Sequence, residues 1–279
     1  DEILKYGCQR FSNNSIAQFT DQEVLTIYLF VMNRYGITKQ KDIYKFAKDN
    51  LRSWFPDLGS YQAFNNRINF LSECMNSLLT HILTEFAPSE CSEIQSVVDS
   101  MPIITCSGKR KGKVATQVTA KGYCSTKSMY YYGLKLHALG FCNKNKLPHP
   151  ESFVISSAAV NDITIFKEHW SQIQNRFFFA DKIYQSATMQ DYMKEVHNSE
   201  ILSPIKTKKG LDKALKKRDE AYNRLYSKAV STIRQPIEAL FSWIIQKTDI
   251  QNASKVRSIK GLNLHVFGRM AAAFISLIF

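Results

Sequence analysis

Over roughly the first ninety residues, apolar side chains recur at the three- and four-residue spacing that is typical of helices. Thr20 and Glu23 form a capping box, because the Thr side chain can accept free amides and the Glu lies three residues further on. Gly36 interrupts the apolar run that follows, and Thr38 is expected to cap a second helix. A third helix is predicted from residue 61 toward residue 86. Its apolar positions are Phe64, Ile68, Leu71, Met75, Leu78, Leu79 and Ile82.

Polar side chains gather near the start of this third helix, at Gln62, Asn65, Asn66 and Arg67. A helix, a turn and a second helix that begins with polar residues suit a protein that reads the DNA major groove. The pattern therefore predicts DNA contacts through Gln62, Asn66 and Arg67. An ordinary helical bundle with a solvated face has the same pattern and remains the alternative.

The pattern changes near Pro88, and this change predicts two domains, residues 1–90 and residues 91–279. Beyond it, apolar runs with strand periodicity alternate with helical ones. The order of elements predicts an α/β (α+β) fold with a mixed sheet covered by helices, as in the ribonuclease-H-like fold, preceded by an all-helical region. Strands are predicted at residues 97–104, 130–139, 153–160, 177–180 and 201–205, and helices at residues 163–173 and 188–196 and from near residues 211, 236 and 262.

The composition excludes a globally disordered chain, because hydrophobic residues make up 44% of its 279 residues. Lys and Arg number 37 against 24 Asp and Glu, and the resulting net charge of +13 favours a polyanionic partner such as nucleic acid. A merely basic enzyme would share this charge. The six cysteines are scattered without a CxxC pair, so neither a zinc site nor a disulfide framework is expected.

The C-terminal segment, residues 262–279, is apolar but is interrupted by Asn263, His265 and Arg269. We therefore expect a buried helix there and no membrane span. No signal peptide opens the chain, and it starts at Asp1 without an initiator methionine, so a trimmed or incomplete start is expected. Together with free thiols, these features predict a cytoplasmic protein.

Three carboxylates lie where a metal site would need them. Asp99 interrupts an apolar strand, where a charge is costly unless it is paired or bound to metal. Asp181 directly follows the apolar run of residues 177–180, and Glu238 lies beside the apolar stripe of the helix that Pro236 begins. Each also has a simpler interpretation, as a strand-end cap, a salt-bridge partner or a first-turn acid favoured by the helix dipole. Periodicity alone does not select the three.

Four short motifs, in order along nearly the whole chain, carry a resemblance to a known family. The chain resembles the DDE transposases of bacterial insertion sequences, most closely the group catalogued as nine-eight-two. The motifs are Val-Asp-Ser-Met-Pro around Asp99, Lys121-Gly122-Tyr123 with the run from Tyr130 to His137, Ala180-Asp181-Lys182-x-Tyr184, and Arg234-x-x-x-Glu238-x-x-Phe241.

The resemblance implies a metal-dependent DNA strand transferase with a ribonuclease-H-like catalytic domain at residues 91–279. Asp99, Asp181 and Glu238 would then be its catalytic, metal-binding residues, holding Mg²⁺ (or Mn²⁺), with two ions expected. The implied partners are double-stranded DNA, as terminal inverted repeats and target, and further copies of the chain in a synaptic complex. Related families carry a Tyr and a Lys where this chain has Ser231 and Ile245, so those two roles are not carried over.

Basic and polar residues around the three carboxylates predict how DNA is held. Arg234 precedes Glu238 by one helical turn and either orients it, holds a phosphate or forms an ordinary ion pair. Lys182 follows Asp181 at a strand end, where a phosphate contact is expected. A glycine-containing stretch without acidic residues predicts a loop that clamps the DNA backbone. Its basic members are Lys109, Arg110, Lys111, Lys113, Lys121 and Lys127.

Three further features complete the expected site. Residues 206–217 form a second basic run. Asp162 is expected to be a helix N-cap and is the reserve metal ligand if Asp99 is not one. His137, alone on a strand, is expected to be structural. Two other functions stay open: a nuclease of the same fold that never joins DNA, and a catalytically inactive DNA-binding remnant.

Overall fold

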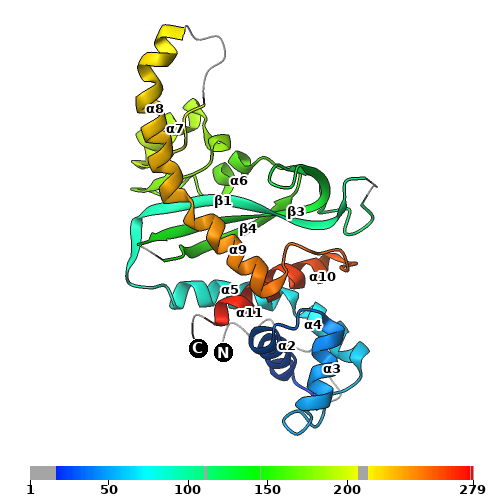
Figure 1. The fold of residues 1–279 in the computed structure, drawn as a ribbon. Helices are drawn as coiled ribbons and strands as arrows, with labels where there is room; N and C mark the ends of the chain where they lie inside the picture. The colour runs from blue at the N-terminus through cyan, green and yellow to red at the C-terminus, as the bar shows by residue number, and fades with distance from the viewer. Residues whose placement is uncertain (1–16, 110–111, 145, 207–212, 277, 279) are drawn as a thin grey trace. The chain divides into compact units, whose positions relative to one another are not determined.

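The computed structural model describes the chain except for residues 1–16, 110–111, 145, 207–212, 277 and 279. The chain forms two compact units. Figure 1 shows the helices and strands of the chain, coloured by residue number. Strand β1 and helix α9 each contribute residues to both units. Unit 1 comprises Asp1–Phe86, Ile103–Thr119 and Trp243–Phe279, and unit 2 comprises Ala87–Pro102 and Ala120–Ser242.

The helices of unit 1 begin with α2, whose capping box is confirmed. The Thr20 side chain accepts from the Glu23 amide, and the Glu23 carboxylate accepts from the Thr20 amide at 2.7 Å. Gly36 ends α2 in the left-handed conformation at φ 65°. The helices are α2 (Asp21–Tyr35), α3 (Gln40–Asn50), α4 (Tyr61–Phe70), α5 (Ser72–Glu85), α10 (Ile259–Asn263), the π-helical turn η2 (Leu264–Gly268) and α11 (Arg269–Ile275).

Two details of the predicted helices were wrong. Thr38 does not cap α3, because Lys39 holds the N-cap position and no side chain satisfies the first amides. The predicted helix from residue 61 to residue 86 is two helices, α4 and α5, separated at Leu71, whose ψ of 12° leaves the helical region. Leu71 is fully buried, so the apolar spacing continues across the break and does not reveal it.

The predicted C-terminal helix is buried, as expected, although it is divided into α10, η2 and α11. Arg269 is the buried cation of this segment and donates to the carbonyl oxygens of Thr248, Asp249 and Thr38. It thereby satisfies carbonyl groups at the end of α9 (Pro236–Thr248). No helix in the described part of the chain is both long and apolar enough to cross a membrane.

Unit 2 contains the sheet, which has six strands in the order β2-β3-β1-β5-β6 with β4 also paired to β3. Strand β2, which forms a hairpin with β3, was not predicted. It has only five residues, and Lys121 and Gly122 at its centre weaken the strand signal. The strands are β1 (Cys91–Ser107), β2 (Ala120–Cys124), β3 (Met129–Asn143), β4 (His149–Ser157), β5 (Phe177–Phe179) and β6 (Glu200–Leu202).

Pairing is antiparallel between β3 and both β2 and β4, and parallel from β1 through β5 to β6. Helix α7 packs against β6, and α8 packs against β5. The other elements of unit 2 are α6 (Asp162–His169), the 3₁₀ turn η1 (Lys182–Tyr184), α7 (Ala187–His197) and α8 (Lys213–Arg234), which leads into α9. This mixed sheet covered by helices has the ribonuclease-H-like fold, as predicted.

The core of unit 2 joins the sheet to α6, η1 and α7. Phe166 lies at its centre, with its ring edge-to-face against Phe178 at 5.1 Å and near the rings of Trp170 and Tyr184. The other buried members are Val98, Leu139, Ala180, Met189, Met193 and Ile201. Because Val98 and Ala180 each precede an aspartate, this core fixes the backbone that carries both carboxylates.

The compact units cut the chain at places other than residue 90, because the C-terminal helices group with the N-terminal ones. The functional division into a DNA-binding part, residues 1–90, and a catalytic part, residues 91–279, stays a prediction.

Gly122 supplies a test of the β2 hairpin. A Cβ at this position would lie 2.5 Å from the carbonyl oxygen of Ala158, so the backbone must shift to accept Gly122→Ala. We expect a loss of about 1–3 kcal/mol in the free energy of unfolding, measured by urea denaturation. The control, Gly59→Ala, meets only the Ala63 side chain at 3.9 Å and should change stability little. Equal stability of the two variants would contradict this packing.

Candidate active site

The parallel pairing of β1 with β5 places two of the predicted carboxylates together. The last paired residues are Val97 and Phe179, and two residues further along the chain lie Asp99, within β1, and Asp181, just past the end of β5. Since alternate side chains share a face of a sheet, the two carboxylates lie level on one face of neighbouring strands. Asp181 keeps an extended backbone, with φ −76° and ψ 167°. The proximity is also electrostatic, because Asp181 raises the pKa of Asp99.

Glu238 comes to the site from the first turn of α9. Pro236 is the first residue of this helix, where its missing amide costs nothing. The predicted buried stripe of the helix is confirmed, since Ile237, Leu240, Phe241 and Ile244 are buried. Glu238 lies beside this stripe with 56% of its side chain exposed, so it is free to change its partner.

Arg234 joins this glutamate to the first aspartate. Its Nη1 donates to Asp99 Oδ2 and its Nη2 donates to Glu238 Oε1, both at 2.5 Å. The other oxygen of Asp99 accepts from the Ser100 amide at 2.8 Å. The Arg234 side chain is only 15% exposed, and its Nε has no hydrogen-bond partner among the described residues. One guanidinium therefore lies between two carboxylates, with one of its own donors unused.

Burial and neighbouring charges shift the pKa values of Asp99 and Arg234. Burial raises the pKa of Asp99 to about 6, while the Arg234 charge and the Ser100 amide act to lower it. Burial on its own lowers the pKa of Arg234, but Asp99 and Glu238 outweigh it, and the net direction is upward. A cationic partner therefore stabilises charged Asp99, because burial opposes its charged form.

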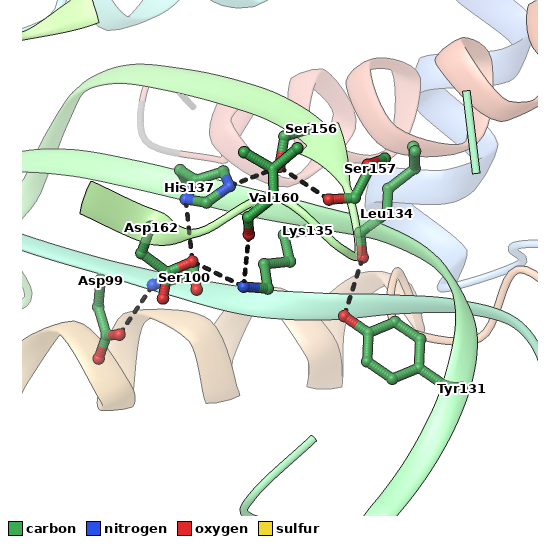
Figure 2. Close-up of polar contacts among 10 residues, drawn as sticks. All are labelled: Asp99, Ser100, Tyr131, Leu134, Lys135, His137, Ser156, Ser157, Val160 and Asp162. Carbon is green, nitrogen blue, oxygen red and sulfur yellow. Dashed lines mark hydrogen bonds and ion pairs between the residues drawn. The ribbon is translucent and has the colours of Figure 1, made fainter. Parts of the chain in front are cut away.

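A second polar network lies beside Asp99 and is drawn in Figure 2. Asp162 Oδ1 accepts from Lys135 Nζ at 2.9 Å, and Lys135 also donates to the carbonyl oxygen of Val160 at 2.9 Å. His137 Nδ1 lies 3.7 Å from the same carboxylate, and its Nε2 contacts Ser156 Oγ at 2.8 Å. This network ties β3 to the start of α6.

The expected role of Asp162 as an N-cap was wrong. It is the first residue of α6, the N-cap position belongs to Asn161, and no side chain caps the helix. The physical reason is the Lys135 ammonium, which binds the Asp162 carboxylate in a mostly buried place, where a charge needs a partner. Asp162 nevertheless raises the pKa of Asp99, so it belongs to the electrostatic surroundings of the site.

The described residues contain no cluster of three or more His, Cys, Asp or Glu side chains placed to hold a metal ion. The donor chemistry still fits a hard cation, because Asp99, Asp181 and Glu238 offer carboxylate oxygens. Arg234 bridges two of these three and provides the positive charge between them. Arg234 holds Oε1 of Glu238, and exchange of this bond for one to a metal would let Glu238 join the aspartates around an ion.

The predicted DNA-binding residues are placed as follows. Arg67 is tied to Asp21 by both guanidinium ends and lies over the Phe70 ring. Lys121 is in β2 rather than in a loop, with its ammonium over the Tyr130 ring. Arg110 and Lys111, and Lys208 and Lys209 of the second basic run, lie outside the described residues. The remaining candidates are exposed: Gln62, Asn66, Lys109, Lys113, Lys127 and Lys182.

Two features of the site were not foreseen. The Arg234 bridge to Asp99 spans 135 positions, and nothing in local periodicity signals it. The ion pair of Lys135 with Asp162 spans 27 positions. The spacing of charges along the chain gives no sign that Lys135 pairs with Asp162.

The geometry above defines a class of protein: a ribonuclease-H-like fold with one aspartate on a central strand, a second just after the adjacent parallel strand, and a glutamate from a nearby helix. Residues 91–275 match the family model described as "Transposase DDE domain", about two thirds of the chain. The chain therefore belongs to the DDE transposases of insertion-sequence type, as the motifs predicted. No curated protein and no solved structure matches it.

Arg234 gives a direct test of the charge balance. In Arg234→Gln the guanidinium no longer neutralises Asp99 and Glu238, so the site gains negative charge and Glu238 is released. We expect Mn²⁺ to bind several-fold more tightly, as measured by isothermal titration calorimetry.

Lys182→Gln is the control for this titration, because it removes a neighbouring positive charge that forms no ion pair with the described carboxylates. It should bind Mn²⁺ nearly as the wild type does. Weaker or unchanged binding by Arg234→Gln would show that Arg234 does not compete with the metal.

The buried His137 side chain is expected to make the folded protein less stable in acid. Burial lowers the pKa of His137 from its ordinary value of 6.5 to about 4, and Asp162 only partly opposes this. Between these values the unfolded chain binds a proton that the folded protein does not, so stability falls as the pH falls from 6.5 toward 4. The loss amounts to about 2–3 kcal/mol.

Urea denaturation at a series of pH values measures this loss. His137→Gln should show a shallower decline between pH 6.5 and 4 than the wild type, since one titrating group is gone. His81→Gln, at an exposed position of α5, should decline as the wild type does. The same slope in both variants would rule out His137 as the source.

Proposed function

We propose that this transposase cleaves DNA at the ends of an insertion sequence and joins them to target DNA, with Asp99, Asp181 and Glu238 as its catalytic, metal-binding residues. The observation that carries the proposal is the placement of Asp99 on β1 beside Asp181 just after the paired strand β5, with Arg234 linking Asp99 to Glu238. The assignment to group nine-eight-two rests on the motifs alone and is part of the same proposal.

The chemistry proposed for the site is an in-line displacement at phosphorus. Water attacks a phosphodiester and loses a proton to solvent, the bond from phosphorus to the 3′ oxygen breaks, and that oxygen takes up a proton from solvent and leaves as a 3′-hydroxyl. The oxygen of this 3′-hydroxyl then attacks a target phosphodiester and loses its proton to solvent. Its bond to phosphorus forms as the bond from phosphorus to the target's 3′ oxygen breaks, and the leaving oxygen takes up a proton from solvent. Two Mg²⁺ or Mn²⁺ ions supply activation of the attacking oxygen and stabilisation of the leaving one.

The protein side chains have separate tasks in this proposal. Asp99 and Asp181 hold the metal from the rigid sheet, and Glu238 approaches from α9 once it leaves Arg234. The released guanidinium is then available to a DNA phosphate, for which its fork of donors is suited. Lys182, exposed and next to Asp181, binds a neighbouring phosphate. The proposed partners are terminal inverted repeats, target DNA and further copies of the chain.

A catalytically inactive DNA-binding remnant is the second candidate. Ser231 and Ile245 replace the Tyr and Lys that related families carry. The described residues also show the glutamate held by Arg234 rather than gathered with the aspartates. A remnant would bind DNA without cutting it in any metal.

The test is a cleavage and joining assay on DNA carrying the ends of the cognate element, with Mg²⁺ or Mn²⁺. Asp181→Asn and Glu238→Gln should each reduce cleavage by at least about a thousandfold if they hold the metal. Lys167→Gln, an exposed change on α6, is the matched control and should cleave as the wild type does.

The products separate the candidates. Joined products establish a transferase, and cleavage without joining indicates a nuclease of the same fold. Binding without cleavage in any metal indicates the remnant. Asp162→Asn addresses the reserve ligand: if it abolishes cleavage while Asp99→Asn does not, the assignment of Asp99 is wrong.

A further inference from the structure

A groove of about 1310 Å³ lies entirely within unit 1. Three stretches that are far apart in the sequence line it. One is formed by the start of α3 and the exposed side of α4, the second by residues 113–117, and the third by the loop and helix of residues 252–261. None of its lining residues belongs to the carboxylate site of unit 2.

The groove carries a strong excess of positive charge. Its exposed cations are Lys39, Lys41, Lys113, Lys255, Arg257 and Lys260, and its one acidic lining residue is Asp249. Among the described residues, Lys39 alone of these six has a carboxylate within 4.0 Å, that of Asp42. Like charges gathered without internal partners raise the local potential and attract an anion.

Amide side chains lie among these cations. Helix α4 provides Asn65, Asn66 and Asn69, and the segment that follows β1 provides Gln117. Asn and Gln side chains can pair with the edge of adenine, whereas Lys and Arg contact phosphates. A surface that combines both types suits a nucleic acid better than a small anion.

The loop of residues 252–261 is fixed in place, so the cations do not depend on a flexible arm. Ile104 of β1 donates its amide to Gln251 and accepts from the Ala253 amide, at 2.8 and 2.9 Å. On the other side, Gly261 packs so closely on α4 that a Cβ would lie 3.3 Å from Asn69 Oδ1. The groove is therefore a preformed surface built from β1, α4 and this loop.

An exposed aromatic ring marks one part of this surface. Phe70 is 49% exposed, and the Lys260 ammonium lies 4.9 Å from its centroid while the Arg67 guanidinium lies 4.7 Å from it. The ring contact leaves the Lys260 ammonium un-neutralised at the surface, whereas the Arg67 guanidinium is already paired with Asp21.

We propose that this groove binds the backbone of double-stranded DNA, with Lys41, Lys255, Arg257 and Lys260 on phosphates and Asn66 toward the base edges. The inference rests on the proposed transposase function for its choice of DNA. It extends the predicted contact of α4 to the C-terminal loop, which no motif had assigned to DNA. It does not depend on metal, because no carboxylate of the catalytic site takes part.

The test is fluorescence anisotropy with a mixed-sequence duplex of roughly 30 base pairs, in EDTA, at salt concentrations between about 50 and 200 mM. Lys41→Gln/Lys255→Gln removes two groove cations. We expect binding weaker on the order of tenfold, and a salt dependence of log K less steep by about 1.8, since each phosphate contact contributes about 0.9.

Lys48→Gln/Lys247→Gln is the matched control, because it removes the same charge from exposed positions of unit 1 outside the groove. It should keep the wild-type salt dependence. Equal effects of the two double variants, wild-type binding by the groove variant, or tighter binding of the wild type to duplex RNA would each overturn the proposal.

The binding assay separates this inference from the proposed chemistry. Asp181→Asn and Glu238→Gln should bind the duplex as the wild type does. If only the groove variant loses binding, the groove is supported even when no variant, nor the wild type, cleaves DNA. If cleavage requires the carboxylates while the groove variant binds normally, the proposed function stands and the groove inference fails.

Discussion

The candidate active site of this transposase depends on one structural constraint, the parallel pairing of β1 with β5. Its register aligns Val97 with Phe179, and the alternation of side chains then brings Asp99 and Asp181 to the same level on the same face. A slip of one residue would send one carboxylate to the opposite face. The large side chains of the core, Phe166 and Phe178 among them, oppose such a slip, because it would also expose them.

Charge compensation is the second requirement of this arrangement. Each partly buried carboxylate beside the sheet has a cation: Arg234 for Asp99 and Lys135 for Asp162. The two pairs differ in exposure, since Arg234 also holds the exposed Glu238, whereas the Lys135 pair lies among buried groups of β3 and α6. This difference suits Lys135 to a fixed structural role and Arg234 to the exchange of partners that we propose for metal and phosphate binding.

Unit 1 shows a different use of charge. Its basic residues form few ion pairs with the described carboxylates, and several gather around one groove. Part of the net positive charge of the chain is therefore concentrated around this groove. Buried Arg269 is the opposite case, because carbonyl oxygens surround it and it holds the end of α9 and the start of α3 in one core.

The sequence by itself determined the helical N-terminal region, the capping box of Thr20 and Glu23, the short strand before Asp181 and the buried stripe of α9. These depend on local spacing and on residues a few positions apart. The family also followed from the sequence, through motifs in order rather than through periodicity. The break at Leu71, strand β2, the partner of Asp162 and the Arg234 bridge were decided only by the tertiary structure. Each of these depends on side chains or strands brought together by the fold, and hydrophobic periodicity reports which face of an element is buried but not what lies against it.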